Sequence, residues 1–263
     1  MLPVRLSPAA LRRISGDALA IPNLRAPIDL DIAERAAALF PALGSDAGWR
    51  ARFGRELNAT DDRQALRSGG KGLPVVDGRH IEPFRVRLEA IERCIRPADA
   101  RRRLRLEPYA HARLAYRDVA SATNRLTLIA AVLPPGCVST HTVFCLRTDL
   151  SRSAHEFLCG IFNSFVVNYL VRMRVSTHVT SATVEQLPIA TEACAPAAVQ
   201  EIAALARNLA RAHDGAAVSR LNARVAMLYE LSAAEYEHVL QTFPLIPIEE
   251  RRAALHAFVD ERR

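Results

Sequence analysis

The chain has 263 residues, 50% of them hydrophobic, which suits one large domain or two small ones with a buried core and excludes wholesale disorder. Its formal net charge is +7 and its pI is about 9.6, and the cationic side chains are almost all arginine, with Lys71 the single lysine. Because a guanidinium makes paired hydrogen bonds to phosphates and guanine edges, this balance favours a nucleic-acid partner.

The cysteine and hydropathy patterns argue against disulfide-rich, zinc-ribbon, secreted and membrane-spanning proteins. The five cysteines are odd in number and include no C-x-x-C pair, so neither a zinc ribbon nor a disulfide framework is indicated. The N-terminus lacks the apolar core of a signal peptide, and there is no apolar run of the roughly 18 residues that a membrane span needs. We therefore expect a cytoplasmic protein with no membrane partner.

Residues 1–48 predict a helical lead-in. Ser7 and Pro8 are a typical helix start, with the serine as the N-cap and the proline in the first turn. A second, amphipathic helix is expected over residues 29–40, where apolar side chains recur at helical spacing.

Residues 49–190 combine strand and helix patterns. Residues 74–119 are expected to form a strand, a short helix over 88–94 and a second strand over 112–119. Two further strands are expected over 126–133 and 138–146. These strands are expected to form one mixed sheet, whose central strand would be the almost wholly apolar 126–133. Ser153 and Glu156 match a capping box, so one long buried helix is expected from Ser153 to about Met173.

The C-terminal residues, 191–263, are predicted to be helical. Helices are expected over 196–213, 217–229 and 249–263, with a further capping box at Ser232 and Glu235. The whole pattern predicts an α+β fold with three parts: a helical lead-in over 1–48, a recognition domain built on a central mixed β-sheet over 49–190, and a C-terminal helical segment over 191–263.

Familiar catalytic motifs are missing from the sequence. It has no Asn-Pro-Pro-Tyr, no Gly-x-Gly after a predicted strand as a cofactor loop would need, no Gly-x-Ser-x-Gly and no His-Glu-x-x-His. The glycine-rich segment 68–72 is not a phosphate-binding loop, because Gly-Leu-Pro follows Lys71 where a helix would have to open. No catalytic residue and no metal site is predicted, although a small enzyme built from distant residues stays an alternative.

A basic run lies over residues 100–105, where four of the six residues are arginine. Two interpretations are open for it: a solvated surface face, or a set of phosphate contacts.

Several segments, in their order and spacing, resemble the C-terminal region of large adenine-specific DNA methyltransferases, such as type IIG restriction–modification enzymes and the methyltransferases of BREX phage-defence systems. The matching segments are 19–27, 49–58 with 73–81, 113–134, 157–188 and the tail 229–244. They include Leu-Pro-Val-Val-Asp-Gly-Arg-His-Ile over 73–81 and an Asn-Ser-Phe-Val-Val-Asn-Tyr-Leu run within 157–188.

This resemblance implies a target recognition domain that grips duplex DNA while a separate domain flips out an adenine and methylates it. That catalytic domain, which would bind S-adenosyl-L-methionine, is absent from this sequence, so no cofactor is expected in this chain. The resemblance therefore implies two partners, double-stranded DNA and a methyltransferase catalytic domain in cis or in trans. A truncated remnant with only a structural role is the alternative.

The matching segments supply the candidate DNA-binding residues, because arginine suits guanine and phosphate and asparagine suits adenine. The candidates are Arg79, His80, Arg113, Arg117, Thr123, Asn124, Arg125, Arg172, Arg174, His178 and Thr180. For each of them, a hydrogen bond or charge that only serves the fold is the competing interpretation.

Overall fold

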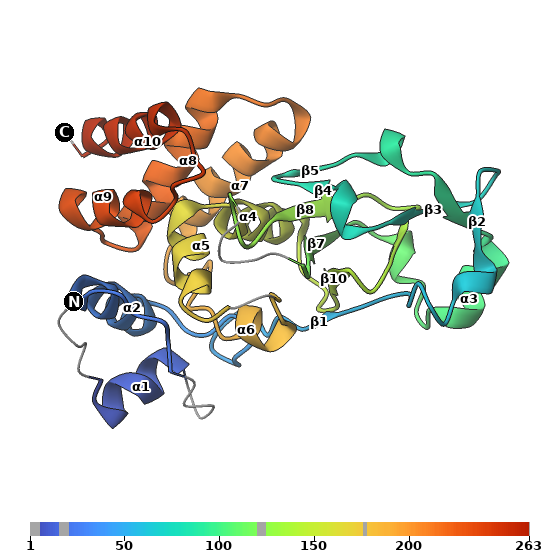
Figure 1. The fold of residues 1–263 in the computed structure, drawn as a ribbon, viewed down its shortest axis with the longest axis horizontal. Helices are drawn as coiled ribbons and strands as arrows, with labels where there is room; N and C mark the ends of the chain where they lie inside the picture. The colour runs from blue at the N-terminus through green and yellow to red at the C-terminus, as the bar shows by residue number, and fades with distance from the viewer. Residues whose placement is uncertain (1–5, 16–20, 120–124, 176–177, 263) are drawn as a thin grey trace.

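The computed structural model describes residues 6–15, 21–119, 125–175 and 178–262. It confirms the α+β class: most of the helices lie towards one end of the molecule and the strands lie towards the other (Figure 1). The helices of both chain ends gather at one end, and the second sheet and its connections form the other. No helix among the described residues is long and apolar enough to cross a membrane.

The main sheet is antiparallel and has four strands. In spatial order these are β1 (Phe53–Gly54), β10 (Val143–Leu146), β7 (Arg113–Arg117) and β8 (Ala130–Leu133). Helix α4 (Arg152–Phe162) packs on β7 and β8. All four residues of β10 are buried, as its run of Val, Phe, Cys and Leu predicts.

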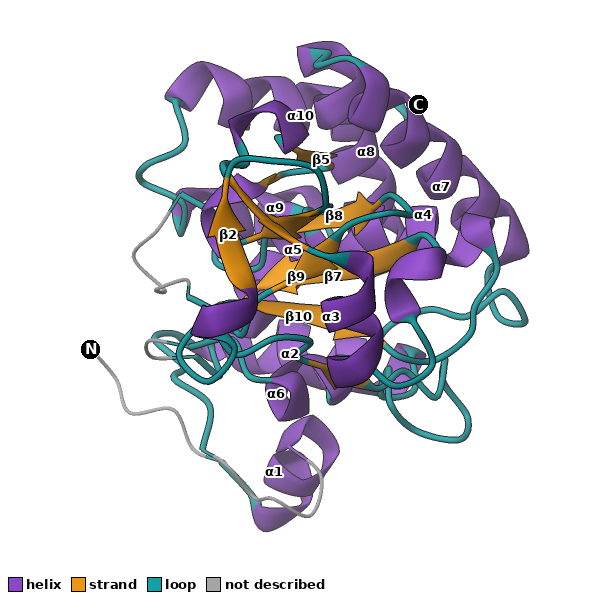
Figure 2. Ribbon diagram, turned by 90° about the vertical axis from the view of Figure 1, so that its right-hand side faces the viewer, coloured by secondary structure: helices purple, strands orange, loops and turns teal. Residues whose placement is uncertain are grey.

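A second four-stranded sheet lies next to the first, on the side that faces the viewer in Figure 2. Its order is β2 (Leu66–Ser68), β6 (Arg93–Ile95), β3 (Leu73–Val76) and β9 (Val138–Ser139), and it is mixed because β3 and β9 run parallel. A hairpin of β4 (Ile81–Glu82) and β5 (Arg85–Val86) follows β3. Short 3-10 turns lie at Arg63–Ala65, Gly78–His80, Leu88–Ala90 and Pro108–Ala110.

The expectation of one sheet is therefore wrong, and the reason lies at Thr140. Its backbone N–H donates to Val76 and its hydroxyl donates to Asp77, at 3.0 and 2.8 Å. These bonds turn the chain, so that the predicted strand 138–146 becomes β9 in one sheet and β10 in the other.

Two further elements differ from the expectation. The predicted central strand 126–133 is regular only as β8, which lies at the end of the main sheet, because the Asn168 side chain binds the backbone of Thr127 and Leu128 instead. The predicted helix 88–94 is a single 3-10 turn followed by β6.

The predicted long helix is two helices, α4 and α5 (Phe165–Arg172). Ser151 rather than Ser153 caps α4, since its hydroxyl accepts from the backbone N–H of Ala154 at 3.1 Å. The chain turns at Asn163, and the hydroxyl of Ser164 then caps α5 by accepting from Val167 at 3.3 Å. Hydrogen bonding at the turn thus outweighs the continuous apolar stripe.

Six of the remaining helices agree with the patterns to within a few residues: α1 (Pro8–Ser15), α2 (Pro27–Leu39), α7 (Pro196–Arg211), α8 (Gly215–Leu228), α9 (Ala233–Gln241) and α10 (Ile248–Asp260). Two short helices, α3 (Pro97–Arg103) and α6 (Ser181–Glu185), were not predicted. Ser7 caps α1 as predicted, through a 3.1 Å bond from the N–H of Ala10. The predicted capping box of Ser232 and Glu235 is also confirmed.

One buried apolar cluster joins the N-terminal helices, the main sheet and the C-terminal helices; Ile32, Tyr116 and Phe243, for example, belong to it. Where α4 crosses α7, Gly160 lets the helices touch, since a Cβ there would lie 2.7 Å from Ile202. A smaller cluster lies under the second sheet. The division into three sequence ranges stays a prediction.

An ion pair between Arg35 of α2 and Glu235 of α9 ties the first helices to the last, with N–O distances of 2.9 and 2.6 Å. The hydrogen bonds from Arg35 lower the pKa of Glu235 to about 2, from an ordinary 4.5. Since the folded-state pKa lies below the unfolded one, this stabilisation is complete above about pH 5 and is lost as the pH falls towards 2.

We therefore expect the wild type to lose about 1 to 2 kcal/mol more of its unfolding free energy than Arg35→Gln between about pH 5 and pH 2, after allowance for solvent screening of a partly exposed pair. Urea unfolding of both proteins at the two pH values measures the difference. Equal losses in the two proteins would contradict the assignment.

Candidate nucleic-acid interface

Positive charge is concentrated in the strand-rich part of the chain. Residues 49–190 carry 22 Lys and Arg against 13 Asp and Glu, whereas residues 191–263 carry 8 against 10. The excess cations therefore lie in the range that builds the two sheets and α3 to α6, and not in the last helices. A charge separation of this kind is typical of a protein surface that binds a polyanion.

Two of the predicted residues, Arg79 and Arg117, are brought together where β7 ends. Gly78 packs against β7 so closely that a Cβ there would lie 3.2 Å from the Cβ of Arg117. Arg79 is exposed and lies 4.0 Å from Asp77. Arg117 is half-buried, and burial lowers its pKa.

His178 reaches the same strand end from the segment after α5. Its Nδ1 lies 3.5 Å from Asp118, and its backbone forms an isolated antiparallel bridge with Val119. Asp118 also pairs with Arg55 at 2.6 Å, so an exposed histidine and an exposed arginine flank one buried carboxylate. Arg55 is a neighbour that the motifs did not indicate.

Arg125 and Arg172 hold the chain around the start of the β8 segment. Arg125 makes a paired contact with Glu250 at 2.6 Å. Arg172 donates to the backbone oxygens of Arg125 and Thr242 and lies 4.0 Å from the ring centroid of Phe243. Burial lowers the pKa of Arg172 to about 10. Both side chains thus make intramolecular contacts that stabilise the fold, although Arg125 is exposed.

Arg174 and Thr180 also serve local structure. Arg174 donates to the backbone oxygens of Gln186 and Ile14, and burial lowers its pKa to about 10. Thr180 caps α6 by accepting from the N–H of Thr183 at 3.2 Å.

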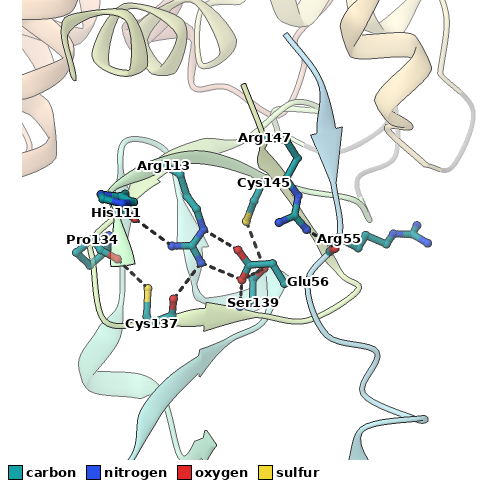
Figure 3. A network of polar contacts seen from close by, with 9 residues as sticks. All are labelled: Arg55, Glu56, His111, Arg113, Pro134, Cys137, Ser139, Cys145 and Arg147. Atoms are coloured by element: carbon teal, nitrogen blue, oxygen red, sulfur yellow. Dashed lines mark hydrogen bonds and ion pairs between the residues drawn. The ribbon is translucent and has the colours of Figure 1, made fainter. Parts of the chain in front are cut away.

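His80 and Arg113 lie inside the protein, which places them outside any surface that could touch DNA. His80 is 2% exposed, and its Nδ1 accepts the backbone N–H of Asp77 at 2.9 Å. Burial lowers the pKa of His80. Arg113 is 4% exposed and makes two hydrogen bonds to Glu56 (Figure 3). We assign both to the fold. The two other candidates, Thr123 and Asn124, lie outside the described residues.

The second sheet and its connections carry exposed cations, and apart from the basic run over residues 100–105 the motifs did not indicate them. In the basic run, Arg101, Arg102 and Arg103 pair with acidic neighbours. Five exposed cations have no partner among the described residues, namely Arg63, Arg67, Lys71, Arg85 and Arg105. What indicates these cations in the sequence is the net positive charge of residues 49–190 rather than any motif.

One non-local polar cluster bears on the alternative of a small enzyme. Asp29 accepts a 2.5 Å hydrogen bond from the Tyr169 hydroxyl and lies 2.7 Å from Nε2 of His238. Its other oxygen accepts the backbone N–H groups of Arg25 and Ala26, where α2 begins. The carboxylate therefore caps α2 and fastens it to α5 and α9, which accounts for the cluster without catalysis.

Neither a metal centre nor a known relative adds to this description. Across the described ranges, no group of three or more His, Cys, Asp or Glu side chains is placed to hold a metal ion. A scan against protein-family models gave no match, and a search of curated proteins found none with significant similarity to this chain.

Proposed function

We propose that this chain is the DNA-binding target recognition module of a site-specific adenine-N6 DNA methyltransferase, in a restriction–modification or phage-defence system. The observation that carries the proposal is the separation of charge, with 22 cations against 13 anions in residues 49–190 and the reverse balance after them. Phosphate contacts dominate affinity for duplex DNA, and arginine is the side chain best suited to them.

The exposed cations fall into two groups, one for phosphate contacts and one for base contacts. Arg63, Arg67 and Arg105, around the second sheet, are free to follow phosphates, since no described residue pairs with them. Arg79 and His178 are exposed donors near the end of β7, and they are the ones to read base edges.

The proposal assigns methyl transfer to another polypeptide or domain. The chain has no cofactor loop and no Asn-Pro-Pro-Tyr, so S-adenosyl-L-methionine would bind the catalytic domain that this module serves. Binding energy from the module would help to offset the few kcal/mol that flipping an adenine costs.

Binding to random duplex DNA across a salt titration tests the proposal. We expect log affinity to fall with log salt at a slope of roughly −3 or steeper, because each phosphate contact contributes about −0.9. Replacing Arg67 and Arg105 together by glutamine should make the slope shallower by about 2. The control variant replaces Arg211 and Arg252, two exposed cations in the C-terminal helices, by glutamine. It removes the same charge and should leave the slope unchanged.

Absence of binding at low salt would reject the proposal for the isolated chain and favour a remnant. Equal effects of the two double variants would mean that net charge alone, and not the surface of the second sheet, attracts the DNA.

A further inference from the structure

A large cavity separates the main sheet from the C-terminal helices. Its volume is about 770 Å³, within the range of small-molecule sites. Its wall is built from the β4–β5 hairpin, the segment leading into β8, the turn between α4 and α5, helices α7 and α8, and the segment before α10. It thus lies where elements from most of the chain meet.

The cavity is mainly apolar and its polar floor is already hydrogen-bonded. Phe84, Ile129 and Phe165 line it and are otherwise buried, with exposed fractions of 8%, 4% and 5%. Asn163 bonds to Ala130 and Asn222 accepts from the N–H of Phe165, so both amides are held in place. The site is therefore preformed for an apolar body.

The charges around the cavity do not cancel. Those that line it are Glu82, Arg85, Arg117, Arg125, His213 and Glu250. Arg125 is neutralised by Glu250, and Glu82 pairs at 3.2 Å with Arg87, which does not line the cavity. Two lining arginines are left over: Arg85, which is exposed, and Arg117, which is half-buried.

Arg117 is half-buried, its Nε is shielded from solvent, and no described residue accepts a hydrogen bond from its side chain. Residues 120–124, which follow shortly after it in the sequence, include no acidic residue. The charge of Glu82 acts on Arg117, but that carboxylate is paired with Arg87. A guanidinium that has lost part of its hydration without gaining a hydrogen-bonded counter-ion is a favourable position for a bound anion.

We propose that this cavity binds a small amphipathic anion: a ring-containing or branched apolar body against Phe84, Ile129 and Phe165, with one sulfonate, carboxylate or phosphate group on Arg117. The proposal stands on the cavity and its half-buried, unpaired cation, and it does not rest on DNA binding.

Fluorescence titration with anilinonaphthalene sulfonate tests the site, because this probe joins apolar rings to one sulfonate. Its uncharged counterpart, phenyl-naphthylamine, supplies the rings alone. We expect the folded full-length chain to bind the sulfonate at one site, about tenfold tighter or more than the uncharged probe. Arg117→Gln should remove that difference by weakening only the sulfonate.

Two control variants separate the cavity from the rest of the surface. Leu245→Trp fills the cavity from an exposed position in its wall and should weaken both probes. Arg79→Gln removes an exposed cation that does not line the cavity and should change neither. Equal affinity of the wild type for the two probes would overturn the proposal even if Arg117→Gln failed to fold, and so would retention of both probes by Leu245→Trp.

Discussion

Replacing Arg113 with alanine should lower the free energy of unfolding by about 3 to 5 kcal/mol, because the buried carboxylate of Glu56 would lose its counter-charge. The side chains of Arg113 and Glu56 are 5% and 0% exposed, and their two hydrogen bonds measure 2.7 and 2.9 Å. Glu56 also accepts the backbone N–H and the hydroxyl of Ser139, and Arg113 donates to the backbone oxygen of Cys137 (Figure 3). Urea unfolding measures the loss.

A surface pair gives the matched control. Arg125→Ala breaks the ion pair between Arg125 and Glu250, whose two side chains are 56% and 47% exposed. This change should lower the free energy of unfolding by at most about 1 kcal/mol. Replacing Arg113 by methionine and Glu56 by leucine together should restore much of the loss, since neither charge then remains buried. A loss below about 1 kcal/mol for Arg113→Ala alone would show that Glu56 finds another partner or water.

Some of the local hydrogen bonds could be predicted from the sequence, whereas the long-range ones could not. The caps at Ser7 and Ser232 involve bonds across three residues, and both are confirmed. The capping-box pattern at Ser153 failed because Glu156 is drawn to Arg207 in α7, which lies 51 positions away. Pattern reasoning had no means of weighing that partner.

The same limit explains the strands. Periodicity over residues 138–146 contains no sign of the turn at Thr140, because the acceptor of its hydroxyl, Asp77, lies 63 positions earlier. The sheet class followed from composition, but the division into two sheets depends on this contact and on the parallel pairing of β3 with β9.

For the candidate site, the sequence indicated residue types but not their exposure. Arg113 and Arg117 belong to one five-residue strand, yet Arg113 is buried and paired with Glu56, while Arg117 lines a cavity. Nothing in the local pattern distinguishes them, since the partner of Arg113 lies 57 positions away. Net charge by range, by contrast, is readable from the sequence and locates the exposed cations of the second sheet.

Asn168→Leu should cost about 3 to 5 kcal/mol, an effect as large as the loss of Arg113. The Asn168 side-chain oxygen accepts the backbone N–H groups of Thr127 and Leu128 at 2.8 and 2.7 Å, and its amide donates to the backbone oxygens of Leu128, Phe162 and Ser164. Asn168 is completely buried. Each buried backbone group that loses its partner costs about 1 to 3 kcal/mol.

Chemical denaturation of Asn168→Leu measures this cost. The control is Asn208→Leu on the exposed face of α7, which makes the same change in helix propensity without burying the side chain. The control should change stability by no more than about 0.5 kcal/mol. A small cost at Asn168 would mean that residues 127–128 find bonds elsewhere, for example by extending β8. A large cost would mean that α5 supplies, through one side chain, the hydrogen bonds that a neighbouring strand would give, which is why this apolar segment does not become a central strand.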